Sequence, residues 1–165
     1  MAKIGSMASA HVSRLLQGAN GANLSLAGLR TAAQTNAMDP GPIQIRPQNV
    51  AAELAEEGEI ARYPMVLVYC EKVVNSLTEK FRTFSGTVQM TAEVRHSMDR
   101  LQGLQDGVEL CVEAVTQVLD ANRGDWGSGM YYAGGYQVGF SGVKHGGLNY
   151  IQAAKVTFEI GVSIS

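Results

Sequence analysis

The stretch KVTFEIGVSI (residues 155–164) is the most regular pattern in this chain and largely decides the fold class that we expect. Every second position is apolar, and the positions between carry polar, charged or small residues. The apolar positions are Val156, Phe158, Ile160, Val162 and Ile164. Because neighbouring side chains of a strand point to opposite faces, this alternation predicts a strand with one buried and one exposed face.

Other segments predict strands that would join the C-terminal one. Residues 86–96 (GTVQMTAEVRH) alternate in the same way, and their apolar positions are Val88, Met90, Ala92 and Val94. Residues 65–70 (MVLVYC) are nearly continuous in apolar residues, as expected of a strand that is covered on both faces. Residues 136–143 (YQVGFSGV) are a candidate for a further strand, joined to the last one by the glycine-containing segment HGGLN.

One segment between the predicted strands has the spacing of an amphipathic helix. Its apolar residues recur at steps of three and four, which places them on one helical face. They are Leu104, Val108, Cys111, Val112, Val115 and Leu119. Asn122 and Gly124 mark its end. We therefore expect an α+β fold: an antiparallel β-sheet with one long amphipathic helix packed on one face, plus a short N-terminal helix and an extended arm.

The N-terminal residues 1–42 are small and polar, and they predict little regular structure. One short helix is expected, which Gly18 would end. The residues that would share its apolar face are Val12, Leu15, Leu16 and Ala19. Proline favours an extended segment at residues 43–46, and helix formers dominate residues 48–57. The expected organisation is an N-terminal arm with a short helix over residues 1–42, followed by a single α+β domain over residues 43–165. Whether the arm is ordered before assembly stays open.

Length, composition and charge exclude several classes of protein. With 165 residues, of which 45% are hydrophobic, the chain suffices for one domain with a real core. Its formal net charge of −2 provides no basic field that would hold DNA or an anionic membrane. No stretch approaches the ~20 apolar residues of a transmembrane helix, and the first residues lack the apolar run of a signal peptide. We therefore expect no action at a membrane.

Cysteine and histidine give no sign of a metal centre. Cys70 and Cys111 lie in apolar surroundings without a metal-ligand spacing, so we interpret them as reduced, buried thiols, although a disulfide stays open. His11, His96 and His145 are widely separated and lack Cys or carboxylate neighbours at ligand spacing. The sequence predicts no metal and no cofactor.

Two groups of charged residues have ordinary structural explanations. Carboxylates surround the start of the predicted helix, where they interact favourably with the helix dipole. They are Asp99, Asp106 and Glu109. A mild basic cluster between two predicted strands reads as a solvated loop, because a nucleic-acid surface needs more charge. Its members are Lys72, Lys80 and Arg82.

The segment GDWGSGMYYAGGY (residues 124–136) concentrates glycine and aromatic residues. It lacks the phosphate-binding GxxxxGK[ST] pattern, and Ser128 lacks the context of a catalytic nucleophile. We predict a long loop whose aromatic rings contact other proteins, since such rings are enriched at interfaces. These residues are Trp126, Tyr131, Tyr132 and Tyr136. Two alternatives stay open: a surface hairpin held by its own aromatic residues, and a lid over a small-ligand site.

The order of elements resembles the tail terminator (tail completion) and neck proteins of long-tailed bacteriophages and prophages. Four segments carry the resemblance: ARYPMVLVY (61–69), FRTFSGTVQMTAEVRHS (81–97), LQDGVELCVEAVTQVLD (104–120) and AAKVTFEIGVS (153–163). It covers roughly residues 45–165 and is a pattern of elements without a signature motif. The loop at 124–136 and the arm at 1–42 look longer than a minimal member needs.

The resemblance implies a structural virion protein, not an enzyme. Such a protein forms a homo-oligomeric ring, commonly a hexamer, that caps the tail tube protein and joins it to the head-side connector. Genomic DNA passes through the lumen without sequence-specific binding, and the ring is assembled in the host cytoplasm. No catalytic residue is implied. The alternative within this class is a head–tail adaptor of another neck layer. Ring contacts are heterologous, and edge strands are natural places for them.

Overall fold

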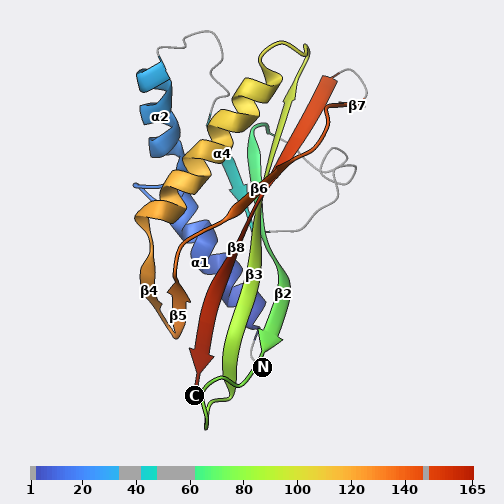
Figure 1. The fold of residues 1–165 in the computed structure, drawn as a ribbon. Coiled ribbons are helices and arrows are strands. Elements are labelled where there is room, and N and C mark those ends of the chain that lie inside the picture. Colours follow the sequence, from blue (N-terminus) through green and yellow to red (C-terminus); the bar gives the residue numbers. More distant parts are fainter. Residues whose placement is uncertain (1–2, 34–41, 48–61, 147–148) are drawn as a thin grey trace.

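A computed structural model describes residues 3–33, 42–47, 62–146 and 149–165 of the chain. Its helices are α1 (Ile4–Gln17), α2 (Ala22–Ala33) and α4 (Leu104–Ala121). Its strands are β1 (Gln44–Arg46), β2 (Met65–Asn75), β3 (Phe84–Met98), β4 (Gly124–Gly127), β5 (Met130–Tyr132), β6 (Gln137–Phe140), β7 (Lys144–Gly146) and β8 (Asn149–Ile164). The fold is α+β, as the sequence predicts (Figure 1).

One sheet contains all of these strands, with the long strands β2, β3 and β8 at its centre. β3 lies between β2 and β8 and is antiparallel to both. β5, β6 and β7 pair with successive parts of the other edge of β8, and β4 pairs with β5. β1 runs parallel to β2, so the sheet is mixed and the prediction of an antiparallel sheet is wrong in this respect. A parallel pair needs a connection of a dozen or more residues, and residues 47–64 supply that length.

The register of β3 on β8 places both alternating apolar sets on one face of the sheet. Residues opposite one another include Val88 and Ile160, Met90 and Phe158, and Ala92 and Val156. All of these side chains are buried in the main core, together with side chains of the helices. The period-two pattern of the sequence therefore identifies the covered face correctly.

Three helices form the layer that covers this face (Figure 1). α1 contacts β2 and β3, α4 contacts β3 and β8, and α2 packs on α4. α4 is the long helix that the sequence predicts, and its apolar stripe is buried. The prediction of a single helix on the sheet is not confirmed, because α1 occupies the part of the sheet that α4 leaves uncovered.

The N-terminal segment is helical over most of its described length. In α1, Ile4, Ala8, Val12 and Leu16 recur every four residues and are buried in the same core as the sheet. Gly21 separates α1 from α2, and a Cβ atom there would lie 2.1 Å from the Leu16 carbonyl oxygen. The expected arm is thus largely a packed helical pair, and the boundary after residue 42 does not separate two cores. Residues 34–41 and the helix predicted over 48–57 lie outside the described residues.

Candidate functional site

The glycine- and aromatic-rich segment forms a short hairpin, β4–β5, that adjoins the C-terminal end of β8 (Figure 1). Trp126 stacks on the His11 ring of α1, with ring centroids 4.7 Å apart, and its Nε1 donates a hydrogen bond to the Asn122 carbonyl at 2.6 Å. Tyr132 is completely buried, contacts Phe158 edge to face, and donates from its hydroxyl to the Gly135 carbonyl. These two rings anchor the hairpin to its own protomer.

The other two aromatic residues of the predicted interface lie at the surface. The Tyr131 side chain is 54% exposed, since it is the outward residue between Met130 and Tyr132 in β5. Tyr136 is 39% exposed, and its hydroxyl donates to the Asp120 carboxylate of α4 at 3.4 Å. Of the four aromatic residues, Tyr131 and Tyr136 therefore offer most of the surface that a second protein could contact.

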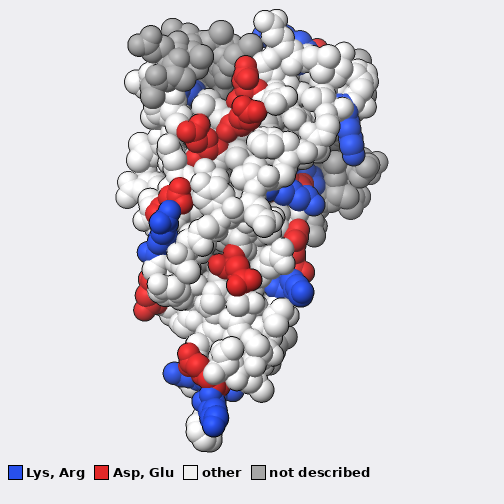
Figure 2. Space-filling view, in the orientation of Figure 1, with Lys and Arg blue, Asp and Glu red and all other residues white. Residues whose placement is uncertain are grey.

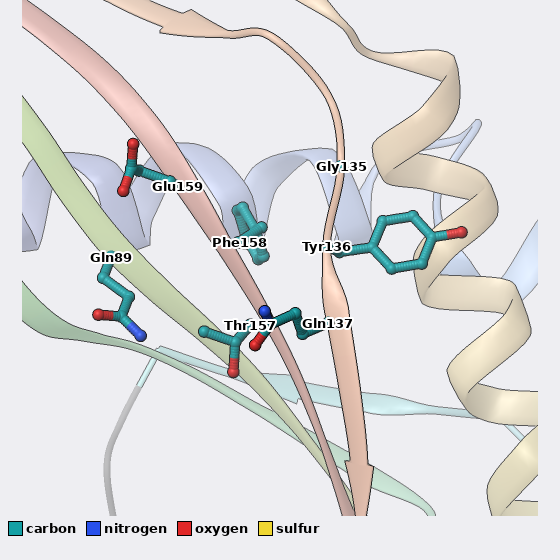
Figure 3. A pocket seen from close by; sticks show the side chains of 7 residues that line it. All are labelled: Gln89, Gly135, Tyr136, Gln137, Thr157, Phe158 and Glu159. Carbon is teal, nitrogen blue, oxygen red and sulfur yellow. The ribbon is translucent and has the colours of Figure 1, made fainter.

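A hollow of about 440 Å³ opens beside β8, between the part that pairs with β6 and the part that pairs with β5. We call it the β8 hollow; it is lined by Gln89, Gly135, Tyr136, Gln137, Thr157, Phe158 and Glu159. Figure 3 shows Tyr136 pointing away toward α4 and Gln137 pointing across toward Thr157, its register partner. Among the described residues, no strand pairs with this edge of β8 over residues 158–160. The sheet is incomplete here.

The loop of residues 76–83, which joins β2 to β3, forms one end of the molecule (Figure 1). Phe81 in this loop is 100% exposed, and Leu77 is 59% exposed. Both have a positive φ, 65° for Phe81 and 49° for Leu77, which is rare for bulky side chains. Lys80 and Arg82, part of the predicted basic cluster, flank Phe81 at the surface.

The outer edge of β2 is a second incomplete edge. β1 pairs with β2 only over Met65–Leu67, and no other described strand pairs with the rest of that edge. A register shift between Cys70 and Lys72 interrupts the pairing of β2 with β3. Bulges and charged residues commonly restrain unwanted pairing at such edges. Beyond Leu67, this edge of β2 therefore has no strand partner among the described residues.

The sheet face opposite the helices carries a buried group of ionisable side chains. The Glu93 carboxylate, 8% exposed, forms a salt bridge with Arg95, accepts a hydrogen bond from the Tyr69 hydroxyl at 3.1 Å and lies 3.8 Å from Lys155 Nζ. Burial, reinforced by Glu93, raises the pKa of Tyr69 well above its ordinary value. None of the hollows described for this protein is lined by Glu93 or Arg95. Among the described residues, the group thus combines one buried carboxylate with two cationic side chains and a tyrosine hydroxyl.

No other arrangement in the described residues suggests catalysis or metal binding. In the part of the chain that the structure describes, no three His, Cys, Asp or Glu side chains converge as a metal site would require. His96 is buried, and its burial lowers its pKa. Cys70 and Cys111 are both free thiols, and burial raises the pKa of Cys111 to about 12, which makes its thiol unreactive.

Charge is dispersed over the face that Figure 2 shows, with acidic and basic side chains separated by uncharged surface. The charged side chains on the solvent side of α4 are all acidic. They are Asp106, Glu109, Glu113 and Asp120. Asp106 lies in the first turn of α4, as the helix-dipole interpretation predicts. Among the described residues, no helix combines the length and apolarity required to cross a bilayer.

Sequence reasoning missed two features of these surfaces. It kept a hairpin over residues 124–136 only as an alternative to a long loop, and it did not use the alternation in MYY, which shows which ring turns inward. It also considered Lys80 and Arg82 without Phe81 between them. An apolar residue in a charged loop is visible in the sequence, but its complete exposure and positive φ are not.

Comparison with protein-family models found no match to this chain, and comparison with curated proteins found none either.

Proposed function

We propose that this chain is a structural subunit of a ring at the head–tail junction of a tailed bacteriophage. In this proposal the ring, expected to be a hexamer, caps the tail tube and joins it to the head-side connector, leaving a channel for DNA. The subunit is a virion component assembled in the host cytoplasm, and it catalyses no reaction. The order of strand, strand, helix and closing strand, which resembles the tail terminator and neck proteins, supports this class.

The observation that carries the proposal is that the protomer has incomplete edges and protruding apolar side chains but no enclosed reactive site among its described residues. Among the described strands, none pairs with the outer edge of β2 beyond Leu67 or with the edge of β8 over residues 158–160. Phe81 and Tyr131 expose aromatic rings at the same end of the molecule. Unpaired backbone groups at strand edges and exposed aromatic side chains commonly form protein–protein contacts.

The charge distribution supports a role beside DNA without binding it. Binding to DNA depends on many Lys and Arg contacts with phosphates, and this chain has 13 such residues against 15 Asp and Glu. The solvent side of α4 is acidic and would repel phosphates. A subunit of this kind would let a genome slide past without holding it.

Two measurements test the proposal together. Light scattering should give a mass near six times the 17.6 kDa of the chain, and electron microscopy should show rings with a central opening. Added tail-tube protein should bind the ring at the ends of tubes and stop their growth. A protein that stays monomeric at all concentrations and binds neither tube nor connector protein would overturn the proposal.

A head–tail adaptor of another neck layer is the alternative within the same class. The two differ in their partner: a terminator binds the tail tube, whereas an adaptor binds only head-side proteins. Pull-down experiments with each partner separately would distinguish them. A ring that binds the connector protein but never the tube would assign this chain to the adaptor layer.

A small-ligand site with residues 124–136 as a lid has less support. The hairpin is held by Trp126, by Tyr132 and by a hydrogen bond from the Ser163 amide to the Gly129 carbonyl at 2.8 Å. A lid must open, and these contacts would all have to break. Alanine substitutions at Trp126 and Tyr131 that abolish binding of a ligand while leaving assembly intact would favour the lid.

A further inference from the structure

Phe81 has no contact inside the protomer that explains its position. Its side chain is fully exposed, although a covered Phe ring removes about 150–250 Å² from water. Its φ of 65° is unfavourable for a bulky residue, and such strain persists only where the surrounding structure imposes it. The loop therefore holds the Phe81 side chain in solvent, although both the exposure of its apolar surface and its positive φ are unfavourable.

Hydrogen bonds give the loop of residues 76–83, which we call the Phe81 loop, a defined shape. The Asn75 side-chain oxygen accepts from the Ser85 amide at 3.1 Å, and the Glu79 amide donates to Ser85 Oγ at 3.0 Å. The Glu79 carboxylate accepts from Arg82 Nε at 3.1 Å and from Ser163 Oγ at 2.9 Å. A side chain displayed on an ordered loop loses little conformational entropy when it binds, so the loop is preorganised as a docking element.

We propose that Phe81 of one copy inserts into the β8 hollow of a neighbouring copy, with Lys80 beside Glu159 of that neighbour. This inference rests on the proposed ring and identifies one of its subunit contacts. The hollow, of about 440 Å³, has room for a Phe ring, and the edge of β8 over residues 158–160 beside it has no strand partner among the described residues. Glu159 is exposed at the hollow, and Lys80 is exposed at the loop, so their charges are complementary.

The other hollows fit this partner less well. The hollow between α1 and β2 has no carboxylate among its lining residues, which are Gly5, Ser6, Ser9, Ala10, Pro47, Val68, Tyr69 and Cys70. Another hollow, which includes Thr78 and Glu79 in its lining, belongs to the base of the Phe81 loop itself. Of these three hollows, the β8 hollow is the one that combines a carboxylate with a position outside the Phe81 loop.

Phe81 cannot fill the hollow of its own chain. The Thr83 amide donates to the Ile164 carbonyl at 2.8 Å, which places the loop beyond the end of β8. Glu159 lies five residues earlier on β8, roughly 17 Å away at the rise of an extended strand. The contact must join two chains through different surfaces. Such a heterologous contact generates a ring when the rotation closes.

The first test compares two Phe→Ala variants by sedimentation over a dilution series. Phe81→Ala should weaken subunit association at least about tenfold, as expected for a central aromatic anchor. Phe140→Ala is the matched control, because Phe140 is half exposed but lies outside both the loop and the hollow. Association that Phe81→Ala leaves unchanged would overturn the inference.

Charge reversal tests the pairing of loop and hollow. Lys80→Glu and Glu159→Lys should each weaken association, and the double variant should recover most of the loss. Recovery would link these two positions across the contact. Two single effects that simply add in the double variant would contradict the proposed pairing.

Disulfide trapping tests the geometry directly. In a Cys70→Ser background, the double variant Phe81→Cys, Gln137→Cys should form a ladder of linked chains under oxidation, whereas each single variant should not.

If the wild-type chain forms rings but the double variant gives no ladder, the Phe81 contact is wrong and the proposed function stands. If the wild-type chain never assembles, the proposed function fails as well. Loss of binding to the tube or connector protein in Phe81→Ala, with rings intact, would assign the loop to that partner and overturn the contact between copies.

Discussion

The two hairpins that meet at the C-terminal end of β8 use their aromatic side chains in opposite ways. The β4–β5 hairpin turns Tyr132 into the core, where it is 0% exposed, while the β2–β3 loop turns Phe81 fully into solvent. Tyr132 follows the inward half of a strand alternation, which the sheet imposes. Phe81 lies in an irregular loop whose hydrogen bonds hold it outward. The difference shows which aromatic residue serves the protomer and which is available to a second molecule.

The largest expected effect comes from removing Tyr132, the aromatic side chain that points into the core. Tyr132→Ala should lower the free energy of unfolding by about 3–5 kcal/mol, because it empties a ring-sized space between Trp126 and Phe158. Tyr131→Ala, the adjacent outward residue, should change it by less than about 0.5 kcal/mol. Urea denaturation of the two variants measures both values. Equal destabilisation of the two would contradict the assignment of inward and outward rings.

A second comparison concerns two carboxylates on the face of the sheet opposite the helices. Glu93→Gln should lower the free energy of unfolding by about 2 kcal/mol, since it removes the negative charge that accepts the hydrogen bonds from Arg95 and Tyr69. Glu159→Gln, at an exposed position on the same face, should have almost no effect on folding. The same denaturation measurement applies. A small effect at Glu93 would mean that other groups compensate the Arg95 charge.

Because Phe81 points into solvent, its removal should affect assembly and leave the folding of the monomer unchanged. Phe81→Ala should leave the free energy of unfolding of the monomer within about 0.5 kcal/mol of the wild type, because no packing contact inside the chain is lost. The measurement requires dilute protein, at which association does not add to stability. A clear destabilisation of the monomer would show that the Phe81 side chain stabilises its own chain, which would contradict its assignment to a second molecule.

The last expected effect concerns pH. Burial lowers the pKa of His96 below its ordinary 6.5, and burial together with Arg14 lowers that of His11. The unfolded chain therefore binds protons at these rings more tightly than the folded one does. Stability should be full above about pH 6.5 and should decrease as the pH falls through the lowered pKa values.

His96→Gln should remove part of this pH dependence, at most about 1.4 kcal/mol per pH unit. Urea midpoints at about pH 7.5 and about pH 5.5 compare the variant with the wild type. The same difference between the two pH values in both proteins would show that His96 is not responsible.

The central elements of the fold could be predicted because their patterns are strong. The alternation in residues 86–96 and 155–164 identifies β3, β8 and their buried face, and the three- and four-residue steps identify α4. β8 begins earlier than expected, at Asn149, because its pairing with β3 continues to Met98 opposite Tyr150. Pairing between strands extends an element beyond the point where its own sequence pattern ends.

The rest depends on contacts between distant segments. α2 has an alanine- and glycine-containing sequence with little periodicity, and it packs on α4, which a local pattern does not reveal. The parallel pairing of β1 depends on partners 21 residues away in the sequence, such as Met65 for Gln44. The interface prediction for Trp126, Tyr131, Tyr132 and Tyr136 treated the four rings alike, although the hairpin directs two of them into its own protomer.

The central claim is that copies of this chain assemble into a ring through their unpaired strand edges. Native mass spectrometry of the wild-type chain over a dilution series tests it most directly, since it counts the chains in each assembly. We predict one dominant species of six chains that dissociates only at low concentration. A spectrum that contains nothing but the single 17.6 kDa chain at every concentration would contradict the account.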